Sequence, residues 1–121
     1  MAKILIVEDD PFLLKMYVKK LQVEGFEVEI AKDGEEGFSK LKSFMPDLAL
    51  MDVMLPKLSG IEVLEKAKLD PQIKNIPILV ISNLSTSTDT ETAIKKGAAG
   101  YLIKSDNTPS QIIEKIKQFI K

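Results

Sequence analysis

Three short runs of almost entirely apolar residues set the strongest limit on how this 121-residue chain can fold. The runs are rich in Ile, Val and Leu, and they cover Lys3 to Val7, Asp47 to Met51 and Pro77 to Ile81. Runs of this length without alternating polar residues are typical of strands that are covered on both faces. Such strands occur mainly in parallel sheets with helices on both sides, so the sequence predicts an α/β domain.

Two further segments have the character of edge strands. Glu27 to Ile30 alternates charged with apolar residues, as a strand with one wet face does. Gly100 to Ile103 is short and comes last, so we place it at the opposite edge. A chain that is 45% hydrophobic and 29% charged can bury one core, and we expect residues 1–121 to form a single domain.

Helical patterns with recognisable ends lie between the strands. Asp10 followed by Pro11 predicts an N-cap with proline at the first helical position, and Gly25 predicts the end of that helix. Thr108 and Gln111 form a predicted capping box for the last helix.

The second and third helices are predicted to begin near Asp33, with Glu36 behind it, and near Ser59-Gly60. Each of these helices has an apolar stripe that we expect to be buried. The stripe consists of Leu14, Tyr17, Val18 and Leu21 in the first helix and of Phe38 and Leu41 in the second. It consists of Ile61, Leu64 and Ala67 in the third helix and of Ile112, Ile113, Ile116, Phe119 and Ile120 in the fifth.

The fourth helix is predicted over Asp89 to Lys96, and its apolar face consists of only Ala93 and Ile94. We therefore expect it to be the least firmly anchored helix. Alternation of five strands with five helices through short connections predicts a doubly wound, mostly parallel sheet with right-handed crossovers.

Polar residues follow several of the strands. Glu8 and Asp9 end the first strand, Asp52 ends the third, Ser82 ends the fourth and Lys104 ends the fifth. Because the carboxyl ends of parallel strands meet at one edge, these side chains are expected to gather there. Ligands of doubly wound sheets bind beyond that edge, at the switch point of strand order.

The residue types that are absent exclude several kinds of chemistry. The chain has no Cys, His, Trp or Arg, which excludes disulfides, Cys or His zinc sites and nucleophiles activated by histidine. The metal ligands that remain are oxygen atoms, mainly of carboxylates, and these favour a hard cation such as Mg²⁺. The net charge is −1 with no polybasic run, so we expect no direct binding to nucleic acid. Without a membrane-spanning run or signal-peptide pattern, we expect a cytoplasmic protein that does not insert into membranes.

Four sequence blocks resemble one known family. They are Ile4 to Pro11, Pro46 to Gly60, Val80 to Ser82 and Gly97 to Lys104. In this order and at these spacings they resemble the receiver domain of two-component response regulators, and in particular chemotaxis regulators. The resemblance implies a flavodoxin-like, three-layer α/β/α fold whose five parallel strands follow the order 2-1-3-4-5.

The resemblance also implies roles for the acidic residues. Asp52 would be the phosphoacceptor, forming an aspartyl phosphate. Glu8, Asp9, Asp52 and the backbone carbonyl of Met54 would hold Mg²⁺, which relieves repulsion among the carboxylates and offsets charge on the phosphoryl group. Asp10, directly before a proline, is better explained as an N-cap than as a metal ligand.

The resemblance also implies roles for a serine, a lysine and a tyrosine that lie at or after the fourth and fifth strands. Ser82 would donate its hydroxyl to a phosphoryl oxygen, Lys104 would pair with the acceptor carboxylate and then with the phosphoryl group, and Tyr101 would turn inward in the phosphorylated state. The donor would be a sensor histidine kinase or phosphotransfer protein. An effector would bind the face formed by the fourth helix, the fifth strand and the fifth helix. Phosphorylation would act by shifting the populations of two conformations of the domain.

Four positions depart from the family pattern. Ser105 replaces the proline that usually follows the lysine, so we expect a trans bond after Lys104 and an altered loop. Asn83 is larger than the usual residue and would crowd the phosphoryl pocket. Met54 and Leu84 are apolar and stand at positions that, in the family, flank the approach of the hydrolytic water. We therefore expect a long-lived aspartyl phosphate.

Two alternatives stay open. A pseudo-receiver would keep the fold as a binding module without phosphorylation; the intact site argues against it, whereas Ser105 and Asn83 are compatible with it. A phosphatase of the haloacid dehalogenase type would need a second aspartate two residues after the nucleophile, where Met54 stands. We therefore predict a module that reacts only on itself and is not a turnover enzyme.

Overall fold

Helices and strands alternate along the whole of the computed structural model, which describes residues 2–83 and 87–120. The elements in chain order are β1 (Lys3–Val7), α1 (Pro11–Val23), β2 (Glu27–Ala31), α2 (Gly34–Phe44), β3 (Leu48–Asp52), α3 (Gly60–Leu69), β4 (Ile78–Ser82), α4 (Ser87–Lys95), β5 (Gly100–Ile103), the 3₁₀ helix η1 (Lys104–Asp106) and α5 (Pro109–Ile120).

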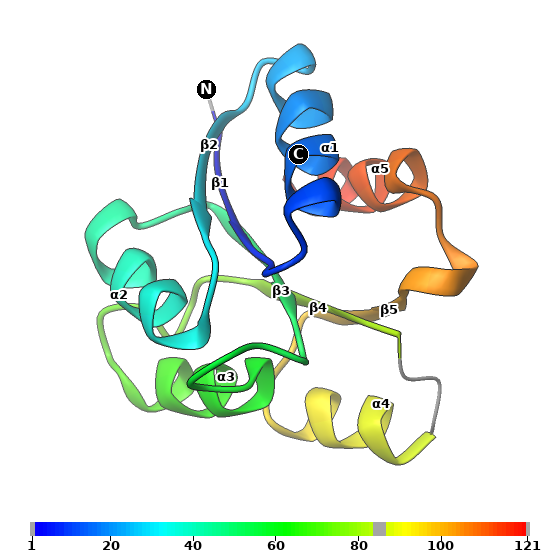
Figure 1. Ribbon diagram of the computed structural model, residues 1–121. Helices are drawn as coiled ribbons and strands as arrows, with labels where there is room; N and C mark the ends of the chain where they lie inside the picture. Colours follow the sequence, from blue (N-terminus) through cyan, green and yellow to red (C-terminus); the bar gives the residue numbers. More distant parts are fainter. Residues whose placement is uncertain (1, 84–86, 121) are drawn as a thin grey trace.

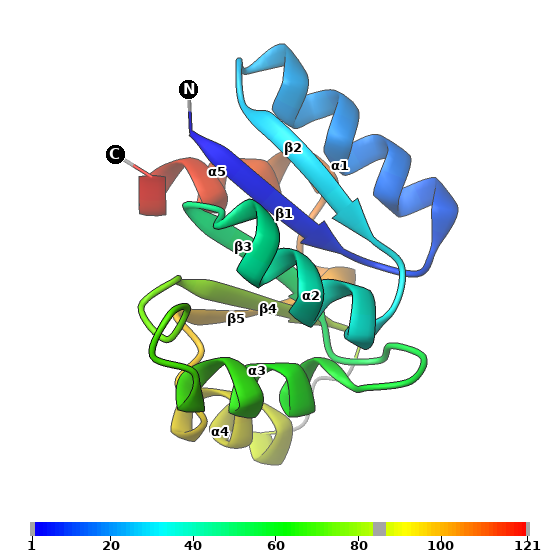
Figure 2. The same ribbon diagram turned by 90° about the vertical axis from the view of Figure 1, so that its left-hand side faces the viewer.

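The strands form one parallel sheet in the order β2-β1-β3-β4-β5. Figures 1 and 2 show α1 and α5 on one face and α2, α3 and α4 on the other. The predicted fold is therefore confirmed, including the strand order and the placement of β2 and β5 at the edges. The order reverses between β1 and β3, which places the switch point at their carboxyl ends.

Two separate cores explain why the central strands contain so few polar residues. Along β1, Ile4 and Ile6 point into the core under α1 and α5, whereas Leu5 and Val7 point into the core under α2, α3 and α4. Both faces of the strand are thus buried, as the continuous apolar runs predicted.

The predicted helix ends agree with the structure. Oδ1 of Asp10 accepts a 2.9 Å hydrogen bond from Phe12 N, which confirms its capping role. Thr108 and Gln111 form the predicted capping box through reciprocal hydrogen bonds of 2.8 and 3.2 Å. Gly25 follows α1 with a φ of 91°, a left-handed conformation that glycine adopts at little cost.

Several predicted boundaries were wrong by one or two residues. Asp47 and Pro77 precede β3 and β4, and each strand instead extends one residue further, to Asp52 and Ser82. The Asp47 carboxylate accepts a 2.7 Å hydrogen bond from the backbone N–H of Lys3. Asp47 therefore links the starts of β1 and β3, although it lies just outside β3. The fourth helix begins two residues earlier than predicted and ends one residue earlier.

Two residues predicted on buried helix faces are about half exposed. Ile94 is 50% exposed, so that Ala93 is the buried member of the predicted pair. Phe119 is 44% exposed, because its ring lies at the margin of the sheet near Gly100 of the edge strand β5. None of the helices within residues 2–83 and 87–120 is both long and apolar enough to span a lipid bilayer.

Candidate functional site

Three polar side chains are buried within the described part of the chain, and all three were predicted to belong to the site. They are Glu8 and Ser82, each fully buried, and Asp52, which is 4% exposed. Each lies at or directly after the carboxyl end of a strand, on β1, β4 and β3 respectively. Burial of polar groups is costly unless a partner compensates it, so the partners of these side chains carry information about function.

Lys104 joins two of the buried acids. Its Nζ atom donates a 2.8 Å hydrogen bond to Oδ2 of Asp52 and lies 2.8 Å from Oε1 of Glu8. Only 11% of its side chain is exposed. Burial opposes the charge on this ammonium, but the two carboxylates outweigh burial and raise the pKa of Lys104 above its ordinary value.

Glu8 is less completely satisfied than Asp52. Its Oε2 accepts a 3.0 Å hydrogen bond from Asp10 N, whereas Oε1 is buried and contacts the ammonium of Lys104 without the angles of a hydrogen bond. Burial raises the pKa of Glu8, and repulsion from Asp52 raises it further, against the lowering effect of Lys104 and the Asp10 N–H. A second cation beside Glu8 would therefore be stabilising.

The acidic residues are grouped in a way that suits a metal ion. One carboxylate oxygen from each of Glu8, Asp9 and Asp52 lies within 4.8 Å of the others. Asp9 is exposed, so the group opens to solvent on that side. An all-oxygen set with one buried, poorly satisfied carboxylate fits a hard divalent cation, and these residues can hold one.

The loop after β3 fixes the carboxylate of Asp52 from its other side. The N–H of Met54 donates a 3.0 Å hydrogen bond to Oδ1 of Asp52, while Oδ2 is bound by Lys104. Both oxygens of this carboxylate are thus oriented by groups that follow two different strands. The side chain of Met54 itself is 63% exposed.

The other predicted residues that the structure describes lie on or directly after β4 and β5. Ser82 is paired in register with Ile103, so it lies one strand away from Asp52 and directly beside the residue that precedes Lys104. Tyr101 is half-buried and packs against the core under α2, α3 and α4. Asn83 is exposed, and Leu84 lies outside the described residues.

The loop after Lys104 differs from the family pattern as predicted. No peptide bond within the described residues is cis, so the bond between Lys104 and Ser105 is trans. The chain turns instead through η1, and the side-chain amide of Asn107 donates a 3.0 Å hydrogen bond to the carbonyl of Ile103. The sequence did not predict this contact, because an asparagine before a helix cap carries no specific signal of it.

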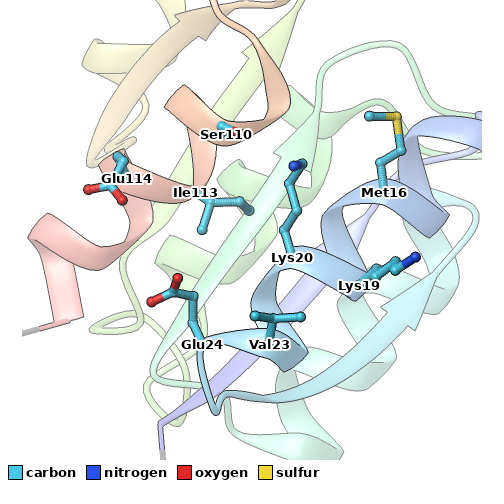
Figure 3. Close-up of a pocket in the computed structure, with 8 residues that line it drawn as sticks. All are labelled: Met16, Lys19, Lys20, Val23, Glu24, Ser110, Ile113 and Glu114. Carbon is cyan, nitrogen blue, oxygen red and sulfur yellow. The ribbon is translucent and has the colours of Figure 1, made fainter.

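A groove of about 550 Å³ lies elsewhere, between α1 and α5. Figure 3 shows Ile113 and Val23 on its walls, with Lys19 and Lys20 on α1 and Glu114 on α5. None of the predicted site residues lines it. The groove is therefore separate from the acidic site at the strand ends.

Comparison with known proteins adds a family match and close structural relatives. The family model of the response regulator receiver domain matches residues 4–117. The polar-differentiation response regulator DivK of Brucella anthropi is 30% identical over 117 residues, which are 97% of this chain and 94% of DivK. The CheY-like response regulator receiver domain protein of Methanospirillum hungatei has 34% identity and a TM-score of 0.88, with 99% of this chain and 94% of that chain covered.

Some relatives are much longer. The phosphate regulon transcriptional regulatory protein PhoB of Rhizobium meliloti is 30% identical over 121 residues, which are all of this chain but 53% of PhoB. The chain thus spans about half the length of that relative.

Proposed function

Because the chain belongs to the family of response regulator receiver domains, we propose that Asp52 accepts a phosphoryl group from the phosphohistidine of a sensor histidine kinase or phosphotransfer protein. The observation that carries this proposal is the buried carboxylate of Asp52 at the end of β3, bound at Oδ2 by Lys104 and at Oδ1 by the Met54 N–H. We further propose that residues 1–121 act as a single receiver domain in the cytoplasm.

In the proposed reaction, a carboxylate oxygen of Asp52 attacks the phosphorus atom of the donor. The new P–O bond forms as the P–N bond to the donor histidine breaks, and the bonding electron pair stays on the imidazole nitrogen, which then takes a proton from solvent. The product is an aspartyl phosphate, which water later hydrolyses. The protein therefore reacts on itself, and receiver domains are signalling modules rather than turnover enzymes.

Glu8, Asp9 and Asp52 would hold Mg²⁺ through their clustered oxygens, together with the backbone carbonyl of Met54. The ion would offset negative charge on the phosphoryl oxygens and the repulsion among the carboxylates. Glu8 supports this assignment in particular, because its buried Oε1 lacks a hydrogen bond.

Lys104 and Ser82 would stabilise the phosphorylated state. Before transfer, the ammonium of Lys104 holds the acceptor carboxylate; after transfer, it would pair with the phosphoryl group that Asp52 carries. The buried hydroxyl of Ser82, at the end of the neighbouring strand, would donate to a phosphoryl oxygen. Aspartyl phosphate adds negative charge at the centre of these groups, which supplies the driving force.

The output would be read on the face formed by α4, β5 and α5. Tyr101 would turn inward as Ser82 moves toward the phosphoryl group, and α4 would shift with it. Ala93 is the buried residue among the described side chains of α4, so little packing opposes such a shift. We propose that an effector protein or domain binds this face and that the receiver itself does not contact nucleic acid.

The test is intact-mass measurement after incubation with Mg²⁺ and a small phosphodonor such as acetyl phosphate. A gain of one phosphoryl group that requires Mg²⁺ and disappears in Asp52→Asn supports the proposal. No gain with any donor would point to a pseudo-receiver, and free phosphate in large excess over protein would point to a phosphatase.

A further inference from the structure

The loop that leads from Asp52 to α3 lies against the first turn of α2. Figure 2 shows this loop reaching the start of α2. The N–H of Gly34, the first residue of α2, donates a 3.1 Å hydrogen bond to the carbonyl of Pro56. A Cβ atom on Gly34 would lie 2.0 Å from the carbonyl oxygen of Leu58 and 2.5 Å from its Cβ. Position 34 therefore has no room for a side chain unless the loop or the helix moves.

The neighbouring residues hold the same loop in a strained conformation. Lys57 has a φ of 69°, in the left-handed region that residues with a Cβ seldom adopt. Its Nζ atom lies 3.6 Å from Oδ2 of Asp33, while Oδ1 of Asp33 caps α2 by accepting a 2.8 Å hydrogen bond from Glu36 N. Strain of this kind persists only where the surroundings determine the loop's path, and here the start of α2 does so.

Both ends of the loop are fixed to other elements. The N–H of Val53 donates to Ile81 of β4 at 3.0 Å, and the N–H of Gly60 donates to Val53 at 2.9 Å. A Cβ on Gly60 would lie 2.2 Å from the carbonyl oxygen of Asp52, so α3 begins directly against the end of β3. A displacement imposed at Leu58 therefore cannot be absorbed at either end, and it passes to the residues between.

Met54 is one of those intervening residues. Its N–H orients the carboxylate of Asp52, and its carbonyl is the proposed backbone ligand of Mg²⁺. We propose that Gly34 is a positioning residue for the magnesium site, since its lack of a side chain allows the loop to place the Met54 carbonyl beside the carboxylates. This inference rests on the proposed function and extends the machinery of the site to α2.

Gly34→Ala tests the inference. Contacts of a Cβ below 3.0 Å are essentially never tolerated, and the 2.0 Å approach is to backbone, which cannot rotate away. Mg²⁺ demands near-ideal octahedral geometry, so a small displacement of one ligand is costly. Because groups that orient metal ligands typically change metal affinity by about 10- to 100-fold, the dissociation constant for Mg²⁺ is expected to rise by about tenfold or more.

Gly37→Ala is the matched control. Gly37 lies in the same helix and is also buried, and its added Cβ would meet Cγ1 of Val7 at 2.9 Å, which is a side-chain contact away from the loop. This variant introduces a packing fault into the same helix, although a smaller one than at Gly34, so a general loosening of α2 would affect both variants. We expect its affinity for Mg²⁺ to stay within about twofold of the unsubstituted protein.

The measurement is calorimetric titration of the three proteins with Mg²⁺, together with amide hydrogen exchange of Met54 in metal-free protein. Weaker binding and faster Met54 exchange in Gly34→Ala alone support the inference. Equal affinity of Gly34→Ala and the unsubstituted protein overturns the inference and leaves the proposed function intact. Absence of Mg²⁺ binding by the unsubstituted protein overturns both.

A milder variant decides the question if Gly34→Ala does not fold. Asp33→Ser retains a capping hydroxyl for α2 but removes the ion-pair partner of Lys57. The amide of Met54 is then expected to exchange about threefold faster, because the loop loses a partly exposed ion pair that holds it against α2. An unchanged rate would overturn the inference.

Discussion

Lys104 donates a 2.8 Å hydrogen bond to Asp52, although the two residues are 52 positions apart in the chain. Lys104 follows β5 and Asp52 is the last residue of β3, and these strands are separated in the sheet by β4. The lysine side chain therefore reaches across the end of an intervening strand. The bond exists only because parallel strands bring their carboxyl ends together. It places a cation where the aspartyl phosphate is proposed to form.

Replacement of Lys104 tests how much this cation contributes to the fold. Lys104→Met leaves Glu8 and Asp52 buried without their cation, and we expect the free energy of unfolding in metal-free protein to fall by about 3 kcal/mol. Urea denaturation at neutral pH measures it. The control is Lys96→Met, which removes an exposed pair with Glu65 and should cost less than about 1 kcal/mol. Equal losses in both variants would contradict the prediction.

The raised pKa of Glu8 predicts a pH-dependent cost. An acid whose pKa is higher in the folded than in the unfolded protein destabilises the fold when it is ionised. The cost is fully present above the raised pKa and is lost as pH falls through that value toward the ordinary value of 4.5. In the presence of a chelator, Glu8→Gln should therefore melt at a higher temperature than the parent at pH 7.

The difference between Glu8→Gln and the parent should shrink as the pH approaches 4.5, which thermal melts across this range can follow. A variant that is less stable than the parent at pH 7 would show that the ion pair with Lys104 outweighs the desolvation of Glu8. That result would contradict the assigned cause of the pKa shift.

Mg²⁺ should stabilise the protein through the same carboxylates. A ligand that binds only the folded state at 100 times its dissociation constant adds about 2.7 kcal/mol to the free energy of unfolding. We expect the melting temperature to rise with Mg²⁺ concentration and to return to its starting value with a chelator. Asp9→Asn should lose most of this shift, whereas Asp106→Asn, outside the acidic group, should retain it. A full shift in Asp9→Asn would exclude Asp9 as a ligand.

The exposed side chain of Met54 predicts slow loss of phosphate. An apolar group beside the site cannot orient the attacking water, whereas an amide can, so Met54→Asn should hydrolyse its aspartyl phosphate about tenfold faster. Leu84→Glu is expected to act in the same direction on the basis of sequence. Decay of the phosphorylated mass after donor removal gives the rates, and rates equal to that of the parent would contradict the prediction.

The sequence predicted the strands and the gathering of polar residues at their carboxyl ends because both depend on local patterns. Apolar runs located β1, β3 and β4 to within one residue, and the polar residues after them had to meet at one edge. Strand order came from the family resemblance alone, since no local pattern specifies which strands are neighbours.

Other features depend on packing between distant segments and carry no local signal. Asp33 was recognised only as the start of a helix, and Gly34 was not singled out. The contacts of Asp33 with Lys57 and of position 34 with Leu58 follow from how α2 and the loop pack together. The exposure of Phe119 likewise depends on its place at the sheet margin. The full burial of Glu8 could not be derived from a sequence in which its two acidic neighbours are exposed.

Locating the phosphoryl group on the chain decides whether Asp52 is the phosphoacceptor. After phosphorylation in the presence of Mg²⁺, borohydride reduction converts an aspartyl phosphate to homoserine, which tandem mass spectrometry of peptides can assign to a position. We predict homoserine at position 52, with none at Asp9, and no homoserine when donor or Mg²⁺ is omitted. Homoserine at another aspartate, or an unmodified Asp52 in protein that has gained a phosphoryl group, would contradict the role assigned to Asp52.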